Sequence, residues 1–249
     1  MGLKRFFCLF AALLVIIIAV KSEPSLQTLH QWSQLTYDQD YDNFKPENNI
    51  LGNVRSYKSN LYVSVPRWRD GVPSTLNVLQ ENGKLRPFPN LDLNQVGPCQ
   101  NLQNVASLEV VGSILWVVDS GTSAIFSRPN KQCSAKLIRM DLEKAEMRIF
   151  HVFSREMVPE NSVILQLVVD QGKFYMANAI QGSILVFDSR AKRSQLVKSE
   201  FMAPKNHPIS LSNGQMTYLR LGVTSLTLQN IGKVRLCSSF QFFKTQRHF

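Results

Sequence analysis

Acidic residues and cysteines are scarce in this sequence, and its cysteines and histidines are not spaced as metal ligands usually are. The 249 residues include 18 Asp and Glu against 28 Lys and Arg, which gives a formal charge of +10, and only four cysteines. No Cys-x-x-Cys occurs and the four histidines are far apart, so we expect no metal site and no cofactor. The hydrophobic content of 44% excludes a disordered chain. The basic excess raises a nucleic acid, an anionic membrane or an acidic ligand as partner.

Most of the positive charge lies at the two ends of the chain. Residues 1–22 hold three basic residues and no acid, and residues 190–249 hold ten basic residues against Glu200 alone. The intervening residues 23–189 carry fifteen basic and seventeen acidic residues. Phenylalanines among basic residues near the end of the chain could stack on bases or touch a membrane, but no nucleic-acid motif accompanies them. We therefore expect no nucleic-acid partner and interpret the end as an irregular or foreign tail.

The segment 1–22 is typical of a secretory signal peptide. Lys4 and Arg5 precede the 15-residue apolar run Phe6–Val20, and Val20-Lys21-Ser22 offers small residues at the −3 and −1 positions of a cleavage site. The alternative is an uncleaved anchor, although a spanning helix needs about 20 residues. No second long apolar run exists, so we predict a secreted, extracellular protein without membrane contact after cleavage.

Three cysteines remain after removal of the signal peptide, because Cys8 lies within it. A secreted compartment favours oxidation. Cys99 and Cys133 flank a strand-like stretch, so we pair them. Cys237 is then free, mispaired or separated from a partner outside this chain. The alternative for each cysteine is a buried thiol.

Short runs of β-branched and aromatic residues repeat along the chain from Ile50 onward. The first unit has strands at 61–66 and 75–79 and then the turn dipeptide Asn82-Gly83. Two further units can be laid over it, each with a strand, a tight turn, a strand, a loop, a strand, a turn and a strand. Their predicted strands are 107–112, 114–119, 136–141 and 148–152, then 165–170, 173–178, 183–188 and 195–198.

A four-stranded repeat of this length indicates an all-β fold, a β-propeller built of four-stranded blades. A partial fourth unit covers 222–228 and 233–236, which makes about three and a half blades. Closed propellers usually have about 4 to 8 blades, so the chain is expected to be truncated, and Leu29–Trp32 is predicted to be a strand that would complete a missing blade. The expected divisions are a signal peptide at 1–22, a partial propeller at 23–236 and a basic aromatic tail at 237–249.

Several motifs resemble the yellow and major royal jelly proteins of arthropods. The most specific string is Val65-Pro-Arg-Trp-Arg-Asp-Gly-Val-Pro-Ser-Thr-Leu76, and a second is Leu115-Trp-Val-Val-Asp-Ser-Gly121. Weaker matches surround Cys133 and residues 182–188, so that the resemblance covers roughly Gln31 to Leu228. It implies a six-bladed propeller, secretion and a Cys99–Cys133 disulfide.

The sequence departs from the family pattern in three places. Asn178-Ala179 stands where the third blade more often has an acid, residues 196–198 lack a usual Trp-Arg, and nothing after Leu236 resembles the remaining blades.

Two polar residues at turns are candidates for contact with a cationic ligand in the propeller channel, Asp119 and the corresponding Asn178. The alternative is structural, with Asp119 accepting backbone hydrogen bonds and Gly121 supplying a positive φ. Arg67-Trp68-Arg69 could stack an aromatic ring or hold an anion, and its alternative is a connection between two strands of the first blade. No residue is assigned as catalytic, because Ser120 lacks both a nucleophile elbow and a nearby histidine.

Three functions from different classes remain. The first is secreted binding of a small aromatic amine or catechol, as the resemblance implies, with roles in cuticle pigmentation, melanin chemistry or secreted fluids. The second is an enzyme of the dopachrome isomerase or tautomerase type, and the third is a truncated product that does not bind. We expect the first and regard an enzyme as the less favoured alternative.

Overall fold

The computed structural model describes residues 27–130, 132–210, 216–229 and 233–237 of the chain. It has two units, residues 1–32 and 33–249. In the first unit the predicted signal peptide lies outside the described residues, and residues 27–32 form no strand, so the strand predicted at 29–32 is wrong. Instead, the rings of His30 and Trp32 stack with their centroids 5.6 Å apart. Among the described residues no helix has the length and apolarity to cross a membrane.

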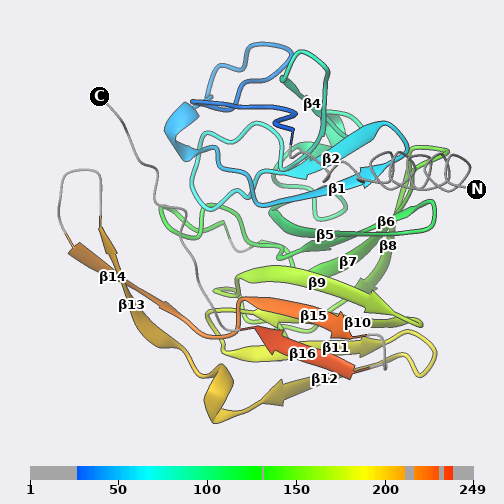
Figure 1. Ribbon diagram of the computed structural model, residues 1–249, viewed down its shortest axis with the longest axis vertical. Helices are drawn as coiled ribbons and strands as arrows, with labels where there is room; N and C mark the ends of the chain where they lie inside the picture. Colours follow the sequence, from blue (N-terminus) through cyan, green and yellow to red (C-terminus); the bar gives the residue numbers. More distant parts are fainter. Residues whose placement is uncertain (1–26, 131, 211–215, 230–232, 238–249) are drawn as a thin grey trace, which may run out of the picture. The chain divides into compact units, whose positions relative to one another are not determined.

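Three four-stranded antiparallel sheets make up most of the second unit, and within each the strands pair in chain order (Figure 1). The first sheet has β1 (Asn53–Tyr57), β2 (Asn60–Ser64), β3 (Leu76–Leu79) and β4 (Leu85–Pro87). The second has β5 (Val105–Val111), β6 (Ile114–Asp119), β7 (Lys136–Asp141) and β8 (Glu146–Val152). The third has β9 (Ile164–Asp170), β10 (Lys173–Asn178), β11 (Ser183–Asp188) and β12 (Arg193–Lys198).

The sheets stack face to face, as the blades of a propeller do. The central strands of a sheet have buried residues on both faces. In β11, which lies between β10 and β12, the five residues from Ser183 to Phe187 are all buried. One apolar cluster joins the first and second sheets and includes Tyr62, Leu108 and Ile138. Another joins the second and third sheets through Leu137, Phe153, Leu167, Phe174 and Leu185. The predicted fold class is confirmed as an all-β partial propeller.

A fourth, two-stranded sheet follows the third. It consists of β15 (Ser225–Gln229) and β16 (Lys233–Cys237), and Val223 and Leu226 pack into an apolar cluster with residues of the third sheet. Gly222 permits this approach, because a Cβ there would lie 2.1 Å from the Met202 carbonyl oxygen. The side chain of Cys237 lies outside the described residues, as do residues 238–249 of the predicted tail.

The sequence did not predict the hairpin of β13 (Lys205–Ser210) and β14 (Met216–Leu221), or the short β1 and β4. Three 3₁₀ helices complete the described structure, η1 (Pro46–Asn48), η2 (Asp92–Asn94) and η3 (Glu200–Met202).

Because the second and third sheets pack through a shared apolar cluster, truncation of one of its side chains should lower the stability of the protein strongly. Phe174 is 1% exposed within the cluster that joins them. Phe174→Ala should lower the free energy of unfolding by about 3–5 kcal/mol, because it removes the ring and leaves a cavity. Phe201, which is 88% exposed, is the matched control, and Phe201→Ala should change it by less than about 0.5 kcal/mol. Equal losses for the two variants in urea titrations would contradict this packing.

Candidate functional site

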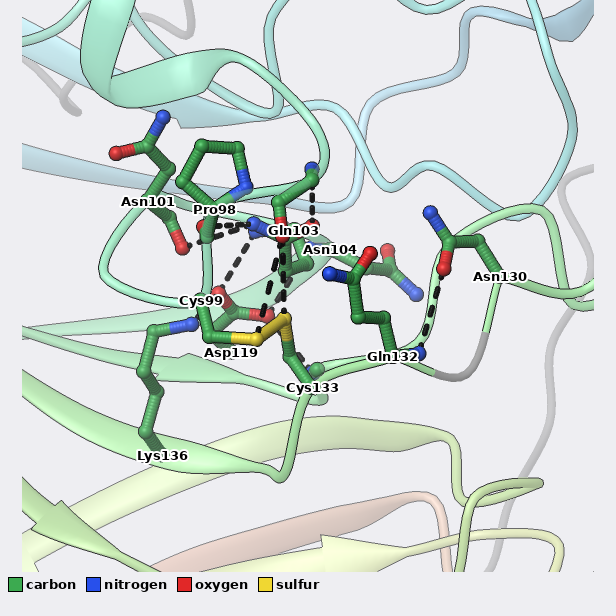
Figure 2. Close-up of a disulfide and its surroundings, with 12 residues drawn as sticks. Pro98, Cys99, Asn101, Gln103, Asn104, Asp119, Asn130, Gln132, Cys133 and Lys136 are labelled. Carbon is green, nitrogen blue, oxygen red and sulfur yellow. Dashed lines mark hydrogen bonds and ion pairs between the residues drawn. A yellow bond between two sulfur atoms is a disulfide. The ribbon is translucent and has the colours of Figure 1, made fainter.

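A disulfide joins two loops at one end of the second sheet. Cys99, in the loop before β5, is bonded to Cys133, in the loop before β7 (Figure 2). Cys133 is 3% exposed, and both sulfur atoms lie near the carbonyl oxygen of Gly97. The pairing expected from the sequence is therefore present, and it ties together the loops that surround the next feature.

A buried ion pair lies beside this disulfide. Asp119, the last residue of β6, is fully buried, and its Oδ2 is 2.7 Å from the Nζ of Lys136, which lies opposite it in β7 and is 2% exposed (Figure 2). The same carboxylate accepts the backbone N–H groups of Gln103, Asn104 and Gly121 at 2.8–3.0 Å. Its oxygens therefore have four donors, and they hold the loop before β5 and the turn after β6 together.

Gly121 is required at this turn. Its φ is +75°, and an added Cβ would lie 2.5 Å from the carbonyl oxygens of Cys133 and Ser134. In the structure, Asp119 therefore accepts backbone hydrogen bonds and Gly121 supplies a positive φ, as the structural alternative from the sequence predicted.

Asn178 occupies the corresponding place in the third sheet, as the sequence suggested. It is the last residue of β10, pairs with Ser183 in β11 and is 1% exposed. Its Oδ1 accepts the backbone N–H of Val163 at 3.3 Å, and its Nδ2 donates to the Ser162 hydroxyl at 2.8 Å. The neutral Asn178 and Ser183 therefore replace the charged Asp119 and Lys136, and both arrangements hold the loop before the sheet's first strand. Ligand contact by Asp119 and Asn178 stays a prediction.

Arg67 is a second buried cation at this end of the sheets. It lies in the connection between β2 and β3, is 4% exposed and directs all five guanidinium N–H groups at backbone carbonyls. These carbonyls belong to Val72, Pro73, Asn94, Leu102 and Gln103. Burial lowers the pKa of Arg67 to about 10, and the charge of Asp119 opposes that shift. Arg67 therefore acts as a hub that joins three loops, which agrees with the structural alternative for this motif.

The ion pair and the arginine are linked through the loop before β5. Asn104, whose N–H is bound by Asp119, accepts the backbone N–H of Arg67 on its side-chain oxygen at 2.9 Å. Gln103 accepts the N–H of Gly97 on its side-chain oxygen at 3.0 Å. Asp119 thus positions the segment that includes Val96 and the backbone of Arg67.

Two cavities adjoin this hub, with volumes of about 320 and 260 Å³, and both are lined by Arg67, Gly71, Val72 and Val96. The larger is completed by residues 41–43 from the segment before β1, together with Pro73, Leu91, Asn94 and Gln95. That segment is fixed to the first sheet, since Leu85 in β4 bonds to the backbones of Thr36 and Asp38 and the Tyr37 hydroxyl donates to Asn49. The smaller cavity is completed by Arg69, Asp70, Ser123, Ala124 and Asn130.

Sequence reasoning missed the larger cavity. The available signal was the run Tyr37-Asp-Gln-Asp-Tyr-Asp42, in which acids alternate with aromatic or amide side chains. Trp68 contributes to neither cavity's lining and packs edge-on against Phe126 with ring centroids 6.1 Å apart.

Stacked four-stranded sheets with disulfide-tied loops define the class as a propeller-type all-β protein. The family model for major royal jelly proteins matches residues 112–244, more than half of the sequence. The chain belongs to the major royal jelly protein family. The match runs beyond Leu236, so the expected end of the resemblance near Leu228 is too early.

Curated relatives include fruit-fly proteins. The Drosophila melanogaster dopaminechrome tautomerase is 27% identical over 173 residues, which are 62% of this chain and 37% of that protein. Protein yellow of Drosophila melanogaster is 30% identical over 167 residues, which are 59% of this chain and 31% of that protein. The chain thus spans about a third of the length of these relatives.

The solved structures that resemble this chain share less sequence identity with it than these relatives do. The extracellular domain of a one-component system from B. thetaiotaomicron has a TM-score of 0.42 at 11% identity, with 77% of this chain and 25% of that chain covered. The N-terminal domain of Nup159 has a TM-score of 0.35 at 13% identity, with 78% and 45% covered. Scores this low carry no argument about function.

Removal of the Asp119 charge should destabilise the protein strongly. Asp119→Asn leaves the Lys136 ammonium buried without its carboxylate, and we expect unfolding free energy to fall by about 3–5 kcal/mol. The double variant Asp119→Asn/Lys136→Met should recover a large part of this loss, because the buried charge is gone. Glu143→Gln, which removes an exposed ion pair with Lys58, is the control and should lower stability far less than Asp119→Asn does. A double variant no more stable than Asp119→Asn in denaturant titrations would refute this explanation.

Proposed function

We propose that this chain is a secreted protein of the royal jelly family that binds a small aromatic amine or related catechol. The observation that carries the proposal is the larger cavity, about 320 Å³ in volume with both apolar and polar walls, held by the Arg67 hub within a family-typical fold. Small-molecule sites combine apolar walls with a few placed polar groups. The disulfide supports an oxidising, extracellular location. Roles in cuticle pigmentation, melanin chemistry or secreted fluids belong to the same proposal.

The binding chemistry follows from the ligand class. An ammonium group pairs with a carboxylate or carbonyl oxygen, while an aromatic ring packs against apolar side chains. For Asp119 to take part directly, it would have to exchange one of its four present donors for the ligand, and Asn178 would have to leave Ser162 or Val163. A positioning role requires no such exchange, because both residues already hold loops in place.

Calorimetry on the purified chain tests amine binding. Dopamine and serotonin should give saturable heats with the folded protein, with a Kd of about 1 mM or tighter. The same titration into protein unfolded in urea is the control and should give only heats of dilution. Absence of saturable binding by any amine of this class to the folded chain would contradict the proposal.

A second candidate function is isomerisation of an oxidised catecholamine, and the relative named dopaminechrome tautomerase favours it. A tautomerisation moves a proton between two atoms of the substrate and needs a group that accepts and returns it. His151 stacks on Phe187 with ring centroids 4.1 Å apart, and burial lowers its pKa, so its imidazole is neutral at pH 7. It is not among the residues that line the larger cavity, and we assign no proton-transfer residue.

A spectrophotometric assay separates this candidate from simple binding. If the chain is an enzyme, the absorbance of dopaminechrome should decay faster with native protein than with heat-inactivated protein, in proportion to protein concentration. Our first proposal predicts equal decay in the two samples. A concentration-dependent excess with native protein would replace the binding proposal by the catalytic one.

A further inference from the structure

We propose that the larger cavity, beside Tyr41, binds a small organic cation with an apolar body, and that the Asp42 carboxylate holds the cationic group. This inference rests on the proposed function and assigns its ligand to a site away from Asp119 and Asn178. The residues that line the cavity come from three segments, 41–43, 67–73 and 91–96. A lining residue can contact a ligand through a polar atom only if that atom is not already hydrogen-bonded within the protein.

Two polar residues of the cavity lining, Arg67 and Asn94, have no free bonding capacity for a ligand. All five N–H groups of Arg67 are bonded to carbonyl oxygens. Asn94 accepts the N–H groups of Thr75 and Leu76 on Oδ1 and donates through Nδ2 to the carbonyls of Phe88 and Asn90. Because the guanidinium has no donor left over, the cavity is not suited to an anion.

Apolar side chains supply much of the remaining wall. Val72 is 7% exposed in the protein as it stands, and Val96 is 40% exposed. Pro73 and Leu91 also belong to the lining. A ligand with a hydrocarbon or aromatic body would remove the exposed part of this wall, chiefly Val96, from water, which favours binding.

Of the two charged residues in the lining, Arg67 and Asp42, only Asp42 has bonding capacity left for a ligand. The side chain of Asp42 is exposed and makes no hydrogen bond or ion pair with the residues that the structure describes. The Tyr41 hydroxyl oxygen has almost no accessible surface, so it is not a contact for a ligand in the cavity.

Acidic residues are concentrated in the segment that leads to the cavity, whereas the cation of the lining, Arg67, is buried and bonded to backbone carbonyls. Asp38 and Asp40 precede Asp42 in the same segment. The basic residue nearest to them in sequence, Lys45, is paired with Asp70. The segment therefore retains a negative charge that attracts cations to the cavity. The volume is near the lower limit of about 300 Å³ for small-molecule sites, which suits a compact ligand.

The test compares two probes on matched variants of the full chain. Dopamine carries an ammonium group, and 4-ethylcatechol has a similar ring and side chain without it. Asp42→Asn should weaken dopamine binding about tenfold or more, because a charge-assisted hydrogen bond is lost, and leave 4-ethylcatechol binding unchanged. Asp40→Asn removes the same charge from the same segment but not from the cavity lining, and it should change dopamine affinity by less than about threefold.

The outcomes distinguish the site from the function. If the wild-type chain binds no amine, the proposed function fails and this site with it. If the wild type binds dopamine but Asp42→Asn and Asp40→Asn have equal effects, amine binding stands and this site is refuted. Equal weakening of dopamine and 4-ethylcatechol by Asp42→Asn would also refute the assignment of the carboxylate. Circular dichroism of each variant confirms that the exposed substitutions leave the fold intact.

Discussion

The ion pair between Asp119 and Lys136 is the interaction on which this end of the molecule depends. Removing two charges from water costs several kcal/mol for each ion, and their mutual attraction alone does not guarantee a gain. Here the carboxylate also accepts three backbone N–H groups, from Gln103, Asn104 and Gly121. The burial of the pair is thus coupled to the positions of two loops, so the pair contributes to a defined loop structure as well as to stability.

The third sheet shows that a neutral side chain can hold the loop before a sheet's first strand in the same way. Asn178 and Ser183 lie where Asp119 and Lys136 lie in the second sheet, and Asn178 holds the preceding loop with neutral hydrogen bonds. What distinguishes the second sheet is its surroundings. Its loop before β5 is also bound by the disulfide and by Arg67, and Arg67 itself lines both cavities.

The sequence predicted the strands of the second and third sheets to within two residues, because most of them contain short apolar runs separated by turns. The turn glycine Gly172, with φ +83°, is one such signal. The strand β1 was missed because its sequence Asn-Val-Arg-Ser-Tyr is mostly polar and contains no apolar run. The hairpin of β13 and β14 was missed because Pro208 lies within its first strand, where proline usually argues against a strand.

The candidate site was harder to predict for a different physical reason. Asp119 and Arg67 could be singled out from their motifs, but whether such groups face a ligand or the backbone depends on bonds between residues that are distant in the sequence. The larger cavity combines Tyr41 with Val96, and an acidic segment such as 37–42 is most often solvated. Only the packing of that segment beside the Arg67 hub makes Asp42 part of a cavity.

Amide hydrogen exchange tests the central claim, that Asp119 holds the loops around the cavities. In Asp119→Asn, the amides of Gln103, Asn104 and Gly121 should exchange about tenfold faster or more, and peptides covering 91–97 should lose protection with them. Phe174→Ala, which is expected to lower global stability by a similar amount, is the control: peptides from β10 and β11 should lose similar protection in the two variants, whereas the loop amides should lose more in Asp119→Asn. Unchanged protection in the loops, or equal loss of loop protection in the two variants, would contradict the account.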